Sequence, residues 1–226
     1  VQVATLIAVI TYFWKDLLAI LNSFLLGLIR RELFKDPLAR LGWMILLATI
    51  PAGVIGLLVR DLVEQAFNSP TMVGAFLLCT AGLLLTAERL GKRLGEVTHI
   101  TWQDALWIGV FQALSIFPGI SRSGATITGG MLRSLQRPAA ARFSFLLMIP
   151  IMVAAGSMAT LDLLELPHLG AMLPGFIPGF LASAVVGYLS IRWLLDYLAR
   201  RPLFGFATYC AIIGAMTIIA SLLHLR

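Results

Sequence analysis

The sequence predicts an all-α polytopic membrane protein, and three observations lead to this fold class. Of the 226 residues, 59% are hydrophobic and only 12% are charged, against roughly 25% charged residues in an average soluble domain. The mean hydropathy is +0.93. The apolar residues also form long uncharged runs instead of being spread along the chain. A soluble domain of this length would need more polar surface to cover its core.

Five uncharged stretches are long enough to cross the hydrocarbon layer, which takes a helix of about 20 residues. They are 41–59, 65–87, 143–161, 166–191 and 202–225. A shorter run, 1–14, predicts part of a sixth span. The run 17–29 either extends that helix past Lys15 and Asp16 or lies at the membrane interface. We therefore expect about six transmembrane helices in one integral membrane domain, residues 1–226.

The segment 105–132 is longer than one ordinary span, and the sequence FPGISRSG interrupts its middle. Pro118 lacks a backbone donor and ends a helix, while Gly119 and Gly124 permit irregular backbone. Each half has about 13 residues, which is half a membrane crossing. We therefore predict a re-entrant helix–loop–helix hairpin over residues 104–134, with Arg122 near the middle of the bilayer.

The distribution of basic residues supports this hairpin. Lysines and arginines cluster in four places, at 15–40, 89–93, 133–142 and 192–201. The loop around Asp162 and Glu165 has none. If the hairpin enters and leaves the bilayer on one side, all four clusters face the cytoplasm, as the positive-inside rule requires. We interpret the net charge of +6 as an orientation signal and as contact with membrane lipid headgroups, and we expect no nucleic-acid partner.

A weak internal correspondence indicates inverted repeats. The stretch 41–59 contains Pro51 with glycines after it, and 166–191 contains Pro178 with glycines in a comparable place. Inverted repeats of membrane proteins show this kind of correspondence. If the repeats exist, the hairpin 104–134 needs a counterpart before Val1, and these residues hold half of an inverted-repeat architecture largely intact.

The segment PGISRSGAT, residues 118–126, is the candidate for chemistry. A charged side chain at mid-depth in a membrane is costly and by default indicates a functional site. Arg122 is flanked by Ser121, Ser123 and Thr126. Backbone amides at a helix start, hydroxyls and a planar guanidinium together suit a phosphate group. The alternative is a structural kink whose arginine bonds nearby carbonyl groups.

All eleven acidic residues lie at or near the ends of the predicted spans or in loops. Gln112 lies in the first half of the hairpin, where its amide bonds either the hairpin loop or another helix. We interpret Glu88 as an interfacial ion pair beside Arg89, and Asp104 as a helix start signal. No group of residues has the spacing of metal ligands, so no metal ligand is predicted within the chain.

Three segments resemble the undecaprenyl-diphosphatase family (UppP), the bacitracin-resistance proteins. They are VQVATLIAVITYFW, GVFQALSIFPGISRSGATITGGMLR and ARFSFLLMIPIMVAA. The resemblance covers essentially the whole chain, and PGxSRSGAT is highly specific. It implies a multi-pass hydrolase of the bacterial cytoplasmic (inner) membrane, with two re-entrant hairpins, a possible homodimer and an active site that faces the outer side. Such an enzyme converts undecaprenyl diphosphate to undecaprenyl phosphate plus phosphate. This recycles the lipid carrier of peptidoglycan synthesis and gives bacitracin resistance.

The resemblance also assigns site residues by position. Those expected to be catalytic and to line the diphosphate site are Ser121, Arg122, Ser123 and Thr126. Those expected to shape the substrate-binding loop are Gly119, Ile120 and Gly124. Gln112 is added to the substrate-binding residues because of its place in the first half of the hairpin, and not from the resemblance. Arg122 would hold the phosphates, and the hydroxyls would donate hydrogen bonds to phosphate oxygens. The nucleophile is either a hydroxyl group or a metal-bound water.

The family's other signature, a glutamate-rich EGxTEFLPxSSTGH hairpin associated with Mg²⁺ or Ca²⁺, does not occur in these residues. We expect it upstream of Val1, in a longer protein of which this chain is a fragment. The fragment alone should then lack metal-dependent phosphatase activity, which the upstream hairpin should restore. Two alternatives stay open: a polyprenyl-phosphate or anion transporter, because transporters also bind substrate between broken half-helices, and a binder without hydrolysis.

Overall fold

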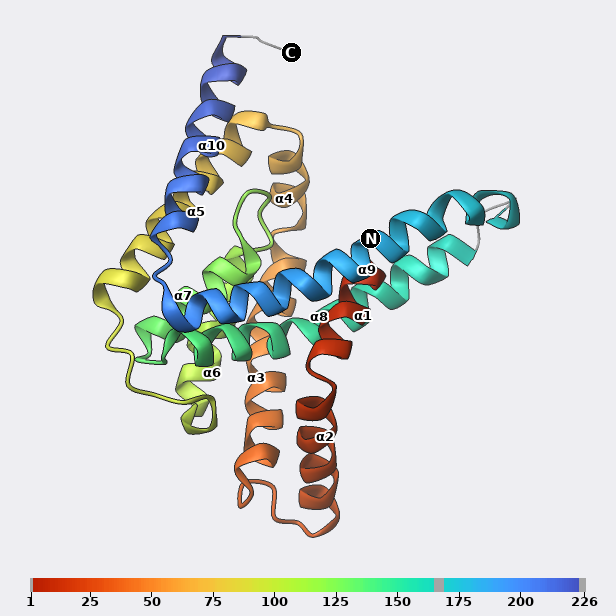
Figure 1. Ribbon diagram of the computed structural model, residues 1–226, viewed down its shortest axis with the longest axis vertical. Coiled ribbons are helices and arrows are strands. Elements are labelled where there is room, and N and C mark those ends of the chain that lie inside the picture. The colour runs from red at the N-terminus through yellow and green to blue at the C-terminus, as the bar shows by residue number, and fades with distance from the viewer. Residues whose placement is uncertain (1, 165–168, 224–226) are drawn as a thin grey trace.

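The computed structural model describes residues 2–164 and 169–223, and every regular element in them is a helix (Figure 1). Five helices are long and apolar enough to cross a membrane, or six if the bent pair of α1 and α2 counts as one span. The prediction of an all-α polytopic membrane protein is therefore confirmed. The loop around Glu165 lies largely outside the described residues.

The helices follow one another along the chain with short connections. Their bounds are α1 (Gln2–Tyr12), α2 (Trp14–Ile29), α3 (Pro37–Leu58), α4 (Arg60–Phe67), α5 (Pro70–Leu90), α6 (Trp102–Leu114), α7 (Arg122–Leu132), α8 (Arg137–Leu164), α9 (Leu169–Arg200) and α10 (Phe204–Leu222). A 3₁₀ turn, Val97–His99, precedes α6. The helices long enough to span are α3, α5, α8, α9 and α10.

The first two helices are bent by 78° relative to each other. The chain stays helical past Asp16, but α2 turns away and packs along α3, while α1 packs against α8 and α9 (Figure 1). An ion pair of 2.6 Å between Asp16 and Arg142 joins the start of α2 to α8. The run 17–29 therefore continues the first helix only through a sharp bend.

The predicted span 65–87 was wrong at its start. Gln65 belongs to the short helix α4, and the spanning helix α5 begins at Pro70. The Ser69 hydroxyl accepts a hydrogen bond from the Met72 amide at 3.3 Å and caps α5, with Pro70 in its first turn. A serine cap followed by proline starts a new helix. A search for uncharged runs does not detect this boundary.

Helices α6 and α7 pack against each other as a folded-back pair. A capping box between Thr101 and Asp104 starts α6, which confirms Asp104 as a start signal. Asp104 also pairs with Arg133, at the far end of α7. A straight helix over this segment would separate these two ends by about 40 Å, so the chain reverses direction between them. The re-entrant position of the pair in a membrane, over residues 104–134, stays a prediction.

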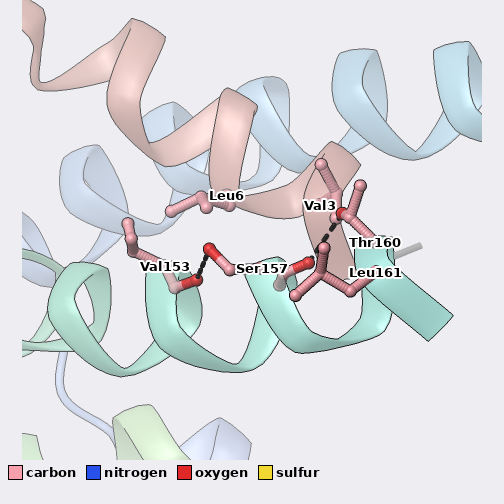
Figure 2. Close-up of a pocket in the computed structure, with 7 residues that line it drawn as sticks. Val3, Leu6, Val153, Ser157, Thr160 and Leu161 are labelled. Atoms are coloured by element: carbon pink, nitrogen blue, oxygen red, sulfur yellow. Dashed lines mark hydrogen bonds between the residues drawn. The ribbon is translucent and has the colours of Figure 1, made fainter. Parts of the chain in front are cut away.

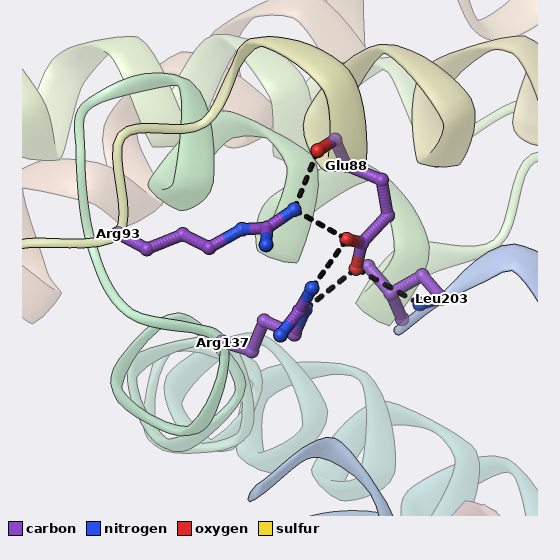
Figure 3. Close-up of polar contacts among 4 residues, drawn as sticks. All are labelled: Glu88, Arg93, Arg137 and Leu203. Carbon is purple, nitrogen blue, oxygen red and sulfur yellow. Dashed lines mark hydrogen bonds and ion pairs between the residues drawn. The ribbon is translucent and has the colours of Figure 1, made fainter. Parts of the chain in front are cut away.

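A buried carboxylate holds the ends of several helices together (Figure 3). The Glu88 side chain is 1% exposed and accepts hydrogen bonds from Arg137 at 2.6 and 2.7 Å, from Arg93 at 2.5 Å and from the Leu203 amide at 2.8 Å. The prediction that Glu88 forms an ion pair is confirmed, with Arg93 and Arg137 as its partners, while the neighbouring Arg89 is exposed. The end of α5 and the starts of α8 and α10 thus meet at Glu88. This agrees with the prediction that the basic clusters lie on one face.

The topology can be tested with single cysteines in a background without Cys79 and Cys210. We expect an impermeant maleimide to label cysteines at Lys35 and Arg200 only after the cytoplasmic side is opened, because both lie in basic clusters. A cysteine at Glu165 should react in intact cells. Labelling of Glu165 and Arg200 from the same side would contradict the re-entrant position of α6 and α7.

Candidate active site

The loop between α6 and α7 is shaped by a glycine and by contact with α5. Gly119 has φ = +98°, a conformation that favours glycine. A Cβ atom at Gly119 would lie only 2.4 Å from the carbonyl oxygen of Val73 on α5. The rings of Phe117 and Phe76 also contact each other, with centroids 5.1 Å apart and planes tilted by 33°. The loop is therefore pressed against α5, and this close approach requires glycine.

The start of α7 carries hydrogen-bond donors that are not used within the helix. Ser121 is the N-cap residue, and its hydroxyl accepts from the Gly124 amide at 3.1 Å, which leaves the hydroxyl hydrogen free to donate. The amides of Arg122 and Ser123 belong to the first helical turn, where no intrahelical acceptor exists. Together with the positive end of the helix dipole, these donors favour an anion.

Arg122 adds a charge to these donors. Its side chain is half-buried, and its guanidinium forms no hydrogen bond or ion pair with any residue in the described part of the chain. The alternative of a structural kink predicted bonds to nearby carbonyl groups, and the structure shows none to a described carbonyl. The five donors of the guanidinium fork are thus available to a ligand.

Thr126 does not lie with the other hydroxyls. It is 1% exposed, and its hydroxyl contacts the Arg122 carbonyl oxygen at 2.9 Å and the Ser144 hydroxyl of α8 at 2.5 Å. This geometry does not support the expectation that Thr126 contacts the diphosphate. Its side chain is buried against α8, and its hydroxyl is already bonded to Ser144 and to the Arg122 carbonyl group. It holds the first turn of α7 in place. Ser144 was missed because no sequence spacing connects it to the motif.

Gln112 is 2% exposed on α6, and neither side-chain amide atom has a hydrogen-bond partner among the described residues. Both expectations for this amide, a bond to the hairpin loop or to another helix, were wrong. A buried amide without a partner costs about 1–3 kcal/mol for each unsatisfied group.

Most of the predicted loop residues line one cavity of about 420 Å³. The site residues that it brings together are Gly119, Ile120, Ser121, Ser123 and Gly124. Its other walls come from α5, α9 and α10 and are mainly apolar; they include Leu77, Leu194, Phe206 and Tyr209. Arg122, Thr126 and Gln112 do not line it. The cavity therefore combines hydroxyl groups with apolar walls, beside the helix start that carries Arg122.

A second cavity of about 400 Å³ lies between α1 and α8 (Figure 2). Its two hydroxyls, from Ser157 and Thr160, each donate to a carbonyl of their own helix, at 2.8 and 2.7 Å. None of its lining residues is charged, and none is a predicted site residue. This cavity suits apolar contact and not phosphate chemistry.

The described residues do not by themselves fit a Mg²⁺ or Ca²⁺ site. Within residues 2–164 and 169–223, no three histidine, cysteine or acidic side chains come close enough to hold a metal ion. Such hard cations need several oxygen ligands. The buried carboxylate of Glu88 is already bonded to Arg93, Arg137 and Leu203.

Comparison with known proteins identifies the family. The chain matches the family model of the bacitracin resistance protein BacA over residues 1–216. It is 40% identical to the undecaprenyl-diphosphatase of Methanosphaera stadtmanae, over 97% of this chain and 82% of that protein. It is 41% identical to the undecaprenyl-diphosphatase of Rubrobacter xylanophilus (99% and 82% covered) and 38% identical to that of Chloroherpeton thalassium (95% and 78% covered). The chain, with its PGISRSGAT loop between α6 and α7, therefore belongs to the bacitracin resistance protein BacA family.

Proposed function

We propose that this protein is a phosphatase that hydrolyses undecaprenyl diphosphate to undecaprenyl phosphate and inorganic phosphate. The relatives reported above carry the name undecaprenyl-diphosphatase. The structural observation that carries the proposal is the Arg122 guanidinium, which has no partner among the described residues and lies beside Ser121 and Ser123 at the start of α7. This activity recycles the lipid carrier of cell wall synthesis and accounts for bacitracin resistance.

The chemistry needs donors that face a strongly anionic group. In phosphoryl transfer, charge spreads over the phosphate oxygens, and catalysis depends mainly on positioning and electrostatic stabilisation. The planar fork of Arg122 can hold two oxygens of the diphosphate at once. We assign hydrogen bonds to the phosphate oxygens to the Ser121 and Ser123 hydroxyls and to the first amides of α7. Thr126 supports this turn from behind.

The apolar walls of the adjacent cavity favour a lipid substrate over a soluble diphosphate. Leu194, Phe206 and Tyr209 face the same space as the Ser121 and Ser123 hydroxyls. In a bilayer the prenyl chain is already out of water, so these side chains favour it through van der Waals contacts and shape and not through burial from water. A polyprenyl diphosphate satisfies both parts of the site.

The location of the site also forms part of the proposal. Arg133, which pairs with Asp104, belongs to the basic cluster 133–142, and the loop joins the opposite ends of α6 and α7. We propose that the loop opens to the outer side of a bacterial cytoplasmic membrane and that the protein forms a homodimer. A role for Mg²⁺ or Ca²⁺ is likewise proposed from the family resemblance alone, and no step here depends on it.

Phosphate release from undecaprenyl diphosphate by the purified full-length protein in detergent tests the proposed reaction. Arg122→Ala serves as the negative control. Release above that of the control supports the phosphatase. Tight binding of the lipid, or its movement across vesicles, without phosphate release would favour the binder or the transporter. The relatives' names give no support to these alternatives.

Gln112 allows a test in which stability and activity change in opposite directions. Gln112→Met keeps the volume but removes an amide that has no described partner. We expect the thermal midpoint in detergent to rise or stay the same, because a buried unpaired amide destabilises the fold. If the amide binds substrate, kcat/KM should fall about tenfold, the effect of one hydrogen bond of about 1.4 kcal/mol. Wild-type kcat/KM would exclude Gln112 from the substrate-binding set.

A further inference from the structure

Thr80 lies in the middle of α5, far in sequence from the PGISRSGAT motif, and is 0% exposed. It follows Phe76 by one helical turn, and Phe76 contacts Phe117 in the loop. Val73, another turn away, touches Gly119 through its carbonyl group. One face of α5 therefore supports the loop between α6 and α7, and Thr80 is the polar member of this face.

The Thr80 hydroxyl bridges two backbone groups of the loop. It accepts a hydrogen bond from the Ser121 amide at 3.1 Å and lies 3.0 Å from the Gly119 carbonyl oxygen, to which it can donate. The carbonyl oxygen of Phe76, within α5, is a second acceptor at 3.1 Å. Because Gly119 and Ser121 flank a single residue, this hydroxyl joins both sides of the turn that leads into α7.

This bridge sets the position of the N-cap. Ser121 must hold an extended backbone, φ −67° and ψ 119°, while its hydroxyl caps the Gly124 amide. Gly119 must hold φ = +98°. Between the two, Thr80 satisfies one donor and one acceptor of the loop backbone that the loop itself does not pair. The methyl group of Thr80 also lies 3.5 Å from the place of a Cβ atom on Gly124.

We propose that Thr80 is a positioning residue for the diphosphate-binding loop, a role that rests on the proposed function. It acts through Ser121 and the first turn of α7, and it does not touch the substrate. The donors of that turn must be placed to within a fraction of an ångström to act on a transferring phosphoryl group, and a displacement of about 1 Å can cost about 10²-fold in rate.

Another threonine of the same helix provides a matched control. The Thr86 hydroxyl donates to the carbonyl oxygen of Gly82 within α5 at 2.8 Å. The Thr80 hydroxyl has the same relation to the carbonyl oxygen of Phe76, at 3.1 Å. Thr86 is exposed and has no bond to the loop among the described residues. Replacement of either threonine by valine removes one hydroxyl from α5 at nearly constant volume. Only the change at Thr80 removes the bridge.

The experiment compares Thr80→Val, Thr80→Ser and Thr86→Val in the native membrane protein, with rates normalised to folded protein. We expect Thr80→Val to lower kcat for undecaprenyl diphosphate by about 10- to 100-fold, with a smaller change in KM. Thr80→Ser should recover most of kcat, and Thr86→Val should behave as wild type. Hydrogen exchange of peptides covering 117–124 should become faster in Thr80→Val only, since the Ser121 amide loses its acceptor.

Each outcome decides the proposal. Wild-type kcat in Thr80→Val, or an equal loss in Thr86→Val, would overturn it, as would failure of Thr80→Ser to recover activity. If Thr80→Val does not fold, Thr80→Cys replaces it, because a thiol keeps the size but bonds weakly. If the wild-type protein releases no phosphate, the proposed function fails, and hydrogen exchange then decides alone whether Thr80 holds the loop.

Discussion

Substitution of Arg122 by lysine in the full-length protein is expected to lower kcat/KM for undecaprenyl diphosphate by about 10²–10³-fold, the usual effect of losing one donor that stabilises a developing charge. Lysine keeps the positive charge but presents a compact ammonium group that cannot bind two phosphate oxygens in one plane. The guanidinium of Arg122 has no partner among the described residues. Its loss therefore breaks no bond within the described structure, and folding should be preserved.

The measurement is the initial rate of phosphate release, with expression and helical content determined for each variant. Arg89→Lys is the matched control, because Arg89 is exposed near the end of α5 and forms none of the contacts of Glu88. We expect Arg89→Lys to retain wild-type turnover. Wild-type turnover in a normally expressed Arg122→Lys protein would mean that Arg122 has a structural role.

The second large effect is expected on stability. Glu88→Gln should lower the free energy of unfolding by about 3–5 kcal/mol, the usual cost of breaking a buried ion pair on one side. The carboxylate is 1% exposed and accepts from Arg93, from Arg137 and from the Leu203 amide. A neutral amide leaves the Arg93 and Arg137 guanidinium groups without their counter-charge. It also replaces one carboxylate oxygen by an NH₂ group, which is a donor and faces other donors.

Glu64→Gln is the control for this prediction. Glu64 pairs with Arg60 at 3.2 Å on the surface of α4, and both side chains are more than 60% exposed. Such pairs contribute about 0–1 kcal/mol, so this variant should unfold nearly as the wild type does. Unfolding can be followed by circular dichroism during titration with a denaturing detergent. Equal stability of the two variants would show that Glu88 does not hold α5, α8 and α10 together.

Within the candidate site, the sequence predicted the segment and its reversal more successfully than the roles of single residues. Pro118, Gly119 and the length of 105–132 indicated two short helices with a break, and the Asp104–Arg133 pair shows that the chain turns back there. Thr126 was predicted to face the diphosphate with Ser121 and Ser123. Side chains three or four positions apart on a helix share a face, so the spacing of Thr126 from Ser123 and Arg122 permitted this prediction. Only the packing of α8 shows that the Thr126 hydroxyl meets Ser144.

The sequence by itself determined the membrane class, because long uncharged runs can be buried only in lipid or against each other. It also determined the family and the PGISRSGAT motif, because the motif residues are adjacent in the chain. Tertiary structure alone decided which distant residues support that motif. Thr80 reaches the loop across 41 positions and Arg137 reaches Glu88 across 49. Such contacts depend on how α5, α7 and α8 pack, and no local spacing encodes them.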